Sequence, residues 1–234
     1  MHDDWGGIGE LMQLPEGAVH RNVDKIVLEA GTKFPDIVKT ALVCPPTIYG
    51  NYILSSTRLA PYLMFADNLI CVGPGRGLFN QKSKQVYILA RVTIQLGFAP
   101  IIGAGSSVWN NIHIHDLSNL FALLIDAAIA EKVNDGLWGA DGYYFVENGE
   151  HVSGELSYAV AEEAAKQGYI PEAKVSHVDL QTGIKYGGHL LASFGKNSRC
   201  KAKRAQKLLS WKAVAPRLKD ELPGILRGEY EGLQ

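Results

Sequence analysis

The chain has 234 residues, which is long enough to bury a core as one large domain or as a domain with a small partner. Its 23 basic and 24 acidic side chains nearly cancel, which argues against the basic footprint of a nucleic-acid-binding protein. A locally basic stretch, Lys196–Lys207, has helical spacing and is typical of a solvated helix face. The three cysteines, Cys44, Cys71 and Cys200, are few and unpatterned, which argues against a disulfide scaffold or a zinc site and favours a cytoplasmic location.

The N-terminal stretch is acidic and lacks the apolar segment of a secretory signal. The most membrane-like window, residues 52–72, contains Arg58, Pro61 and Asp67, and a spanning helix needs about 20 predominantly apolar residues. We therefore expect neither a membrane-spanning segment nor a membrane partner.

The first predicted elements are a helix followed by a buried strand. Residues 14–31 carry apolar side chains at helical spacing, and Gly31 stands where a C-terminal cap belongs. Residues 38–46 form a short apolar run that two prolines close, which indicates a strand. A helix leading into a buried strand is typical of a parallel sheet with helical crossovers.

The next predicted elements include a histidine-containing junction. Residues 83–97 read as a helix that ends at Gly97, and a short strand and a Gly-x-Gly turn follow. His113 and His115 alternate with isoleucines, which predicts one strand and one face for both, and Asp116 or Ser118 would cap the next helix. Further along, the pattern predicts a strand and turn over 142–150, then helices over 154–168, 197–211 and 218–232.

Five stretches in this order carry a family resemblance: CPPTIYG, GPGRGLFNQKS, APIIGAGSSVWNNIHIHDLSNLF, GYYFVENGEH and NSRCKAKRAQKLLSWK. Together they resemble the C-terminal portion of an extended short-chain dehydrogenase/reductase of fungal type, from the NAD(P)-dependent epimerases, dehydratases and reductases. The resemblance implies an α/β, incomplete Rossmann-like (doubly wound) fold that lacks its N-terminal nucleotide-binding half. It also implies a single partial domain over 1–234, with a small α/β substrate-side lobe over about 170–234.

One stretch, Asn51–Val72, interrupts this resemblance, because such proteins read CPPTIYG directly into PGRG. We hypothesise that it is a translated intron, with a GT in the codon of Gly50 and an AG where the codons of Val72 and Gly73 meet. A genuine insertion is the alternative, since each doubling of a loop's length costs only about 0.6 kcal/mol.

The resemblance places a catalytic Tyr-x-x-x-Lys pair on the helix before CPPTIYG. His20 and Asp24 occupy those positions here, and Lys25 comes one residue late, about 100° round the helix. An imidazole and a carboxylate one turn apart form a candidate acid–base pair. The alternative is an exposed helical ion pair worth about 0.3–0.5 kcal/mol.

The same resemblance implies the other sites. Pro46 and Tyr49 would line the nicotinamide end of an NAD or NADP site, and Asn80 and Arg199 would face a small-molecule substrate. We expect no metal, because His113, His115 and Asp116 lack a further convergent ligand. Tyr143, Tyr144 and Phe145 are expected to pack in a sheet.

Neither glycine-rich stretch, Gly6–Gly9 or Gly73–Gly77, follows a predicted strand and opens a helix as a dinucleotide-binding turn requires. The sequence therefore leaves two hypotheses open. The first is an oxidoreductase or epimerase acting at a C–OH/C=O centre, inactive as this chain alone. The second is a non-catalytic binding or regulatory module, or a non-functional fragment. An exposed sheet edge would favour self-association, so oligomerisation stays open.

Overall fold

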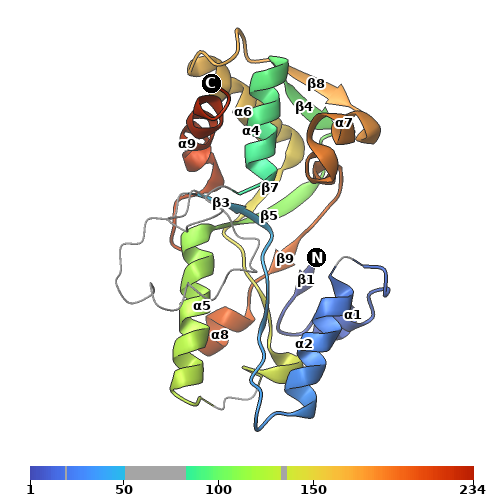
Figure 1. Ribbon diagram of the computed structural model, residues 1–234, viewed down its shortest axis with the longest axis vertical. Helices are drawn as coiled ribbons and strands as arrows, with labels where there is room; N and C mark the ends of the chain where they lie inside the picture. The colour runs from blue at the N-terminus through green and yellow to red at the C-terminus, as the bar shows by residue number, and fades with distance from the viewer. Residues whose placement is uncertain (19, 51–82, 133–135) are drawn as a thin grey trace. The chain divides into compact units, whose positions relative to one another are not determined.

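The computed structural model describes residues 1–18, 20–50, 83–132 and 136–234 (Figure 1). The predicted insertion, 51–72, and the candidate substrate residue Asn80 lie outside the described residues. The chain divides into two compact units. Unit 1 comprises Met1–Pro45, Asp116–Glu147 and Cys200–Ala213, and unit 2 comprises Pro46–His115, Asn148–Arg199 and Val214–Gln234.

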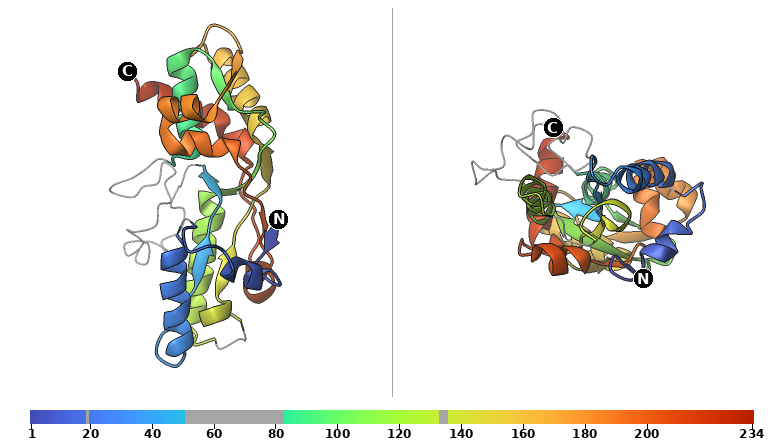
Figure 2. Two further views of the ribbon diagram at one scale, coloured as in Figure 1. Left: turned by 90° about the vertical axis from the view of Figure 1, so that its right-hand side faces the viewer. Right: turned by 90° about the horizontal axis from the view of Figure 1, so that it is seen from below.

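Unit 1 contains two pairs of parallel strands with helices beside them (Figure 1). The strands β1 (His2–Asp3) and β9 (Cys200–Lys201) form one pair, and β2 (Leu42–Cys44) and β6 (Tyr143–Phe145) form the other. The helices are α1 (Ile8–Met12), α2 (Arg21–Lys33), the 3-10 turn η1 (Gly139–Asp141), α8 (Arg204–Leu209) and most of α5 (Ile114–Ile129). Figures 1 and 2 show α2 running beside β2.

Helix α2 differs from its prediction at both ends, because it begins at Arg21 and continues to Lys33. Gly31 does not cap it and instead lies buried inside it. A Cβ at this position would come within 2.1 Å of Thr40 Oγ1 and 2.7 Å of Gly139 Cα. The glycine is therefore required for close packing of the helix against the neighbouring backbone and not for a turn.

A fully buried carboxylate, that of Asp4, joins three elements of unit 1. Its Oδ1 accepts the backbone N–H groups of Lys203 at 2.7 Å and Arg204 at 2.9 Å, where α8 begins. Its Oδ2 accepts the N–H of Phe145 in β6 at 2.8 Å. Asp4 therefore ties the end of β1 to β6 and α8.

In its described residues, unit 2 contains a three-stranded sheet, a separate pair of strands and four helices. The sheet has the order β3 (Thr47–Tyr49), β5 (Val108–His113) and β7 (Glu150–Val152), with β3 parallel and β7 antiparallel to β5. Strands β4 (Ala99–Ile102) and β8 (Val175–Val178) pair in parallel. The helices are α4 (Gln85–Leu96), α6 (Ser153–Lys166), α7 (Leu180–Ala192) and α9 (Leu218–Glu231), with the 3-10 turn η2 (Ser193–Gly195) after α7. Apolar side chains of α4, α6 and α9 form most of the core.

The middle of the chain confirms part of the prediction and corrects part of it. Helix α4 ends at Leu96, and Gly97 caps it with φ of 74°. Strand β5 ends at His113, so His115 lies in α5, and Asp116 lies in the first turn of that helix instead of capping it. The alternation misled the prediction because Ile114 is buried in the helix as it would be in a strand. The predicted helix over 197–211 is wrong, since β9 precedes a shorter α8.

Among the described residues, no helix is long and apolar enough to cross a membrane.

Candidate functional site

The two predicted catalytic residues lie together at the start of α2 in unit 1. His20 is the N-cap residue, and its carbonyl accepts the N–H groups of Val23 and Asp24, each at 3.0 Å. Its side chain is exposed and its φ is 66°, a left-handed conformation that few non-glycine residues adopt. The backbone of His20 is therefore held in an unusual conformation, at a position where the family resemblance predicts a catalytic residue.

Asp24 lies in the first turn of α2, where its side chain is half-buried. Burial raises the pKa of this carboxyl group, and the nearby charges of Arg21 and His20 oppose that rise. Within the described part of the chain, no hydrogen bond or ion pair joins the side chains of His20 and Asp24. The two side chains interact through their charges, and burial favours the protonated form of Asp24.

Two further ionisable groups lie near Asp24: Cys44 in β2 and Tyr143 in β6. The Tyr143 hydroxyl and the Cys44 thiol lie close enough to affect each other's pKa, and burial raises the pKa of both groups, that of Cys44 to about 12. The charge of Asp24 adds to both rises, and Arg21 opposes the rise at Tyr143. We call Arg21, Asp24, Cys44 and Tyr143 the α2 cluster.

The α2 cluster favours acid–base chemistry over nucleophilic chemistry. A thiol whose pKa is raised this far stays protonated near neutral pH and is a poor nucleophile. Arg21 is buried, and its guanidinium donates to the Met12 carbonyl at 2.6 Å. The sequence predicts that Tyr143 packs in a sheet, and it does not single out Arg21. Tyr143 comes near the other residues of the cluster only because β2 pairs with β6.

In unit 2, the predicted nicotinamide-side residue Tyr49 is fully buried. Its hydroxyl donates to the Pro216 carbonyl at 2.7 Å, and its ring meets that of His113 edge-on, with 5.3 Å between ring centroids. The Tyr49 ring therefore contributes to the core of unit 2. Pro46 is partly exposed in the link between β2 and β3, and its cofactor role stays a prediction.

His113 lies at the carboxyl end of β5 and is 3% exposed. Its Nδ1 accepts the backbone N–H of His115 at 3.1 Å, and its Nε2 lies 3.7 Å from Oε1 of Glu221. These contacts assign the proton of the neutral ring to Nε2, facing the carboxylate. Across the described ranges, no three His, Cys, Asp or Glu side chains converge in a way that could hold a metal ion.

Arg199, the predicted substrate-facing residue, already binds a carboxylate of unit 2. Its Nε lies 3.2 Å from Glu150 Oε1, and its second terminal nitrogen lies 2.8 Å from Oε2. Glu150 pairs with Asn110, three residues before the end of β5, whereas Tyr49 pairs with His113 at that end. The structure therefore does not bring Arg199 and Tyr49 together, and an anionic substrate at Arg199 would have to displace Glu150.

The first glycine-rich stretch differs from its prediction, because Gly6–Gly9 follows β1 and opens the five-residue helix α1. Two of its backbone donors, the N–H groups of Gly6 and Gly7, are already used, as is that of the preceding Trp5. The N–H groups of Trp5 and Gly6 donate to Asp3 Oδ1 at 3.0 and 2.8 Å, and that of Gly7 donates to the Asp3 carbonyl at 3.1 Å. The bond from Gly6 above all, then the ammonium group of Lys203 and the bond from Trp5, lower the pKa of the Asp3 carboxyl group to about 2.

This turn is a poor match to the pyrophosphate site of a dinucleotide, since Asp3 already holds the N–H groups of Gly6 and Gly7 and the helix that follows has only five residues. The second glycine-rich stretch, Gly73–Gly77, lies outside the described residues.

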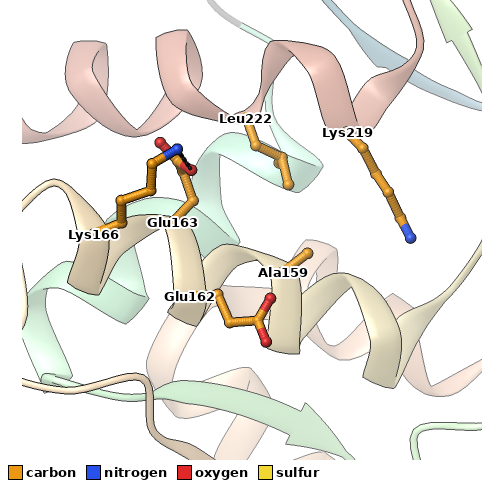
Figure 3. Close-up of a pocket in the computed structure, with 6 residues that line it drawn as sticks. All are labelled: Ala159, Glu162, Glu163, Lys166, Lys219 and Leu222. Carbon is orange, nitrogen blue, oxygen red and sulfur yellow. Dashed lines mark hydrogen bonds and ion pairs between the residues drawn. The ribbon is translucent and has the colours of Figure 1, made fainter.

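A shallow groove of about 290 Å³ lies between α6 and α9 in unit 2 (Figure 3). It is lined by Ala159, Glu162, Glu163, Lys166, Lys219 and Leu222. Glu163 and Lys166 on its rim pair with each other at 3.2 Å. None of the predicted site residues that the structure describes lines this groove.

Comparison with known proteins supports the family resemblance. The chain is 35% identical over 237 residues to the Oxidase ucsJ of Acremonium sp, an alignment that spans 99% of this chain and 62% of that protein. No family model matches the chain.

Solved structures of epimerases and dehydratases superpose on most of the chain. The UDP-glucose 4-epimerase of Thermotoga maritima is 14% identical with a TM-score of 0.54, covering 92% of this chain and 53% of its own. The NAD-bound dTDP-glucose 4,6-dehydratase DesIV of Streptomyces venezuelae is 14% identical with a TM-score of 0.53, covering 89% and 48%. The fold is therefore an incomplete Rossmann-like α/β fold. The chain spans about half the length of these solved structures and less than two thirds of the curated relative.

Proposed function

We propose that this chain contributes the acid–base side of an NAD- or NADP-dependent oxidoreductase or epimerase that acts at a C–OH/C=O centre of a small metabolite. The proposal is supported by the similarity to Oxidase ucsJ and by the epimerase and dehydratase fold. One observation carries it: Asp24 is a half-buried carboxyl group with a raised pKa, beside the carboxyl end of β2. Ligands of open α/β sheets bind at the carboxyl ends of strands.

In this proposal Asp24 exchanges a proton with the substrate oxygen, and His20 tunes its charge. A carboxyl group whose pKa is raised keeps its proton to a higher pH than an exposed one, which suits it to general acid–base work. The cofactor would supply hydride transfer when bound. In the described turn Gly6–Gly9, Asp3 already holds the N–H groups of Gly6 and Gly7, so we expect the 234-residue chain to be an inactive cytoplasmic protein by itself.

A non-catalytic binding or regulatory role is the second candidate. Two observations favour it. The guanidinium group of Arg199 is already bound by Glu150, and the N–H groups of Gly6 and Gly7 already donate to Asp3. The same activity assay decides between the two candidates.

The assay follows nicotinamide fluorescence with secondary alcohols, ketones and sugar nucleotides. The chain is tested alone and co-expressed with the part of Oxidase ucsJ that it does not span. We expect turnover only in the co-expressed sample, and a loss of about 10²-fold or more in Asp24→Asn. The matched control is Asp36→Asn, an exposed acid in the same unit. If the co-expressed sample is inactive, or if Asp24→Asn is as active as the control, the catalytic proposal is wrong.

A further inference from the structure

Arg21, the first residue of α2, carries a buried positive charge whose hydrogen bonds are incomplete. Its side chain is buried, and the residue is 5% exposed. One terminal nitrogen donates to the Met12 carbonyl at 2.6 Å, and the other lies 3.7 Å from the Met12 sulfur. In the described part of the chain, its Nε has no hydrogen-bond partner. Because buried polar groups are normally hydrogen-bonded, this directed N–H donor is left for another group.

A second buried arginine of unit 1, Arg204, shows the same group with its Nε satisfied. Arg204 is 4% exposed. Its Nε donates to the Asp4 carbonyl at 2.9 Å, and one terminal nitrogen donates to the Gly136 carbonyl at 2.6 Å. Its charge also acts on the buried Asp4 carboxylate. Of these two buried arginines, Arg21 is the one that keeps an Nε–H available to an acid.

Asp24 is an acid on the same face of α2 as Arg21. At about 100° per residue, positions 21, 24, 28 and 31 fall within about 80° of one another. Arg21, Leu28 and Gly31 on this face are buried, and Asp24 is half-buried. Residues three apart on a helix are neighbours, with about 5–6 Å between their Cβ atoms. A change of side-chain rotamer is therefore enough to bring the Asp24 carboxylate to the Nε–H of Arg21.

Three other titratable groups lie near Asp24: His20, Cys44 and Tyr143. Burial raises the pKa of Cys44 and of Tyr143, so neither is an anion near neutral pH. The charges that act on Asp24 are those of Arg21 and His20. Of these two residues, Arg21 keeps its charge at every working pH, because a guanidinium group is not deprotonated in proteins.

Glu16 is a second acid on which the charge of Arg21 acts. It is exposed, and its carboxylate binds Lys25 at 2.6 Å. This ion pair engages Glu16, and it also engages the lysine that directly follows Asp24 in the sequence. Asp24 is therefore better placed than Glu16 to accept the Nε–H of Arg21.

We propose that Arg21 is a positioning residue for Asp24, and that its available Nε–H binds and orients the Asp24 carboxylate once the proton has left. In the proposed reaction, the O–H bond of Asp24 breaks and an O–H bond forms on the substrate oxygen. The negative charge left on Asp24 is stabilised by a charge-assisted hydrogen bond from Arg21, and the reverse transfer releases it. The pairing does not require the reaction, whereas its catalytic consequence rests on the proposed function.

Carboxyl-carbon NMR of the 234-residue chain tests the pairing without cofactor or turnover. The signal of Asp24 is identified by its loss in Asp24→Asn. In Arg21→Gln it should titrate at a higher pH than in the unsubstituted chain, because the carboxylate loses a neighbouring positive charge. Lys25→Gln is the matched control, since it removes a positive charge from the position after Asp24 that Glu16 already binds. This control should leave the titration of Asp24 nearly unchanged.

The NMR signal of the Arg21 Nε–H gives a second readout, which leaves Arg21 unsubstituted and so does not depend on the folding of Arg21→Gln. This signal should shift over the pH range in which Asp24 titrates, and it should stay constant over that range in Asp24→Asn. The inference is overturned if the signal does not follow the titration of Asp24. It is also overturned if Asp24 titrates at the same pH in Arg21→Gln and Lys25→Gln.

The activity assay separates this inference from the proposed function. In the co-expressed sample, Arg21→Gln should lower kcat for carbonyl reduction about tenfold with little change in KM, and move the Asp24 limb of the kcat–pH profile to higher pH. Arg21→Lys should recover part of the loss, because it keeps a charge and a donor. If NMR shows the pair but Asp24→Asn is as active as Asp36→Asn, the pairing stands and the catalytic proposal is wrong. If Asp24→Asn abolishes turnover and NMR shows no pair, the catalytic proposal stands and this inference is wrong.

Discussion

Gly50 lies directly against the ring of His113, so that a Cβ on residue 50 would come within 2.0 Å of His113 Nε2. The backbone of Gly50 also has φ of 93°, which side-chain-bearing residues rarely adopt. We expect Gly50→Ala to lower the free energy of unfolding by about 2–4 kcal/mol, because backbone strain and overpacking add.

The matched control for this substitution is Gly97→Ala. Gly97 has a similar positive φ of 74°, but a Cβ there would meet nothing within 4 Å. Gly97→Ala should cost only the strain of a side-chain-bearing residue at positive φ, about 1–2 kcal/mol in the free energy of unfolding. Denaturant unfolding of both variants measures the difference, and equal losses would show that the ring of His113 moves aside at little cost.

Gly31 inside α2 allows a second comparison. Alanine normally stabilises a helix interior relative to glycine by about 0.8–1 kcal/mol. At Gly31 its Cβ would meet Thr40 Oγ1 and Gly139 Cα, so we expect Gly31→Ala to destabilise by about 1–3 kcal/mol. Gly228→Ala in α9 meets nothing within 4 Å and should stabilise by about 0.5–1 kcal/mol. Thermal unfolding that moved in the same direction for both variants would contradict this packing.

His151 makes the stability of the chain depend on pH. Burial lowers its pKa from 6.5 to about 4, and in the described structure its Nε2 has no hydrogen-bond partner. The unfolded chain therefore binds the extra proton between these values. The contribution of neutral His151 to the free energy of unfolding is present above about pH 6.5. It is lost progressively as the pH falls to about 4, by up to about 3 kcal/mol.

Urea unfolding at a series of pH values from 4 to 7 measures this loss. His151→Gln removes the titrating group and should flatten the dependence by that amount. An unchanged slope in the variant would show that other groups cause the acid sensitivity.

The three hydrogen bonds to Asp4 predict a large effect of a small change. Asp4→Asn keeps the shape but leaves a single acceptor oxygen, so an N–H of Phe145, Lys203 or Arg204 loses its bond. We expect a loss of about 2–4 kcal/mol in the free energy of unfolding. Asp36→Asn, at an exposed position, should stay within about 0.5 kcal/mol. Equal stability of the two variants would contradict the role of Asp4.

Local patterns predicted some elements correctly and others incorrectly, for physical reasons. The end of α4 at Gly97 was predictable, because a left-handed cap selects glycine locally. The role of Gly31 was not predictable, because its packing partner Gly139 is distant in sequence. His115 was assigned to a strand since alternation cannot show where Ile114 passes from strand to helix.

The residues of the candidate site were also predictable only where the local sequence decides their placement. The helical placement of Asp24 was predictable from the apolar spacing, whereas His20 lies before the helix as its left-handed N-cap residue, and the catalytic role of both remains a proposal. The pairing of Arg199 with Glu150 was not, because it depends on the contact of β7 with a distant segment. Asn80 lies outside the described residues.

The measurement that tests the central claim most directly is calorimetric titration of NAD and NADP into the 234-residue chain, alone and co-expressed with the unspanned part of Oxidase ucsJ. We expect binding only in the co-expressed sample, because Asp3 holds the N–H groups of Gly6 and Gly7 and the helix α1 that follows has only five residues. Binding by the chain alone would contradict it, and so would its absence from a formed complex.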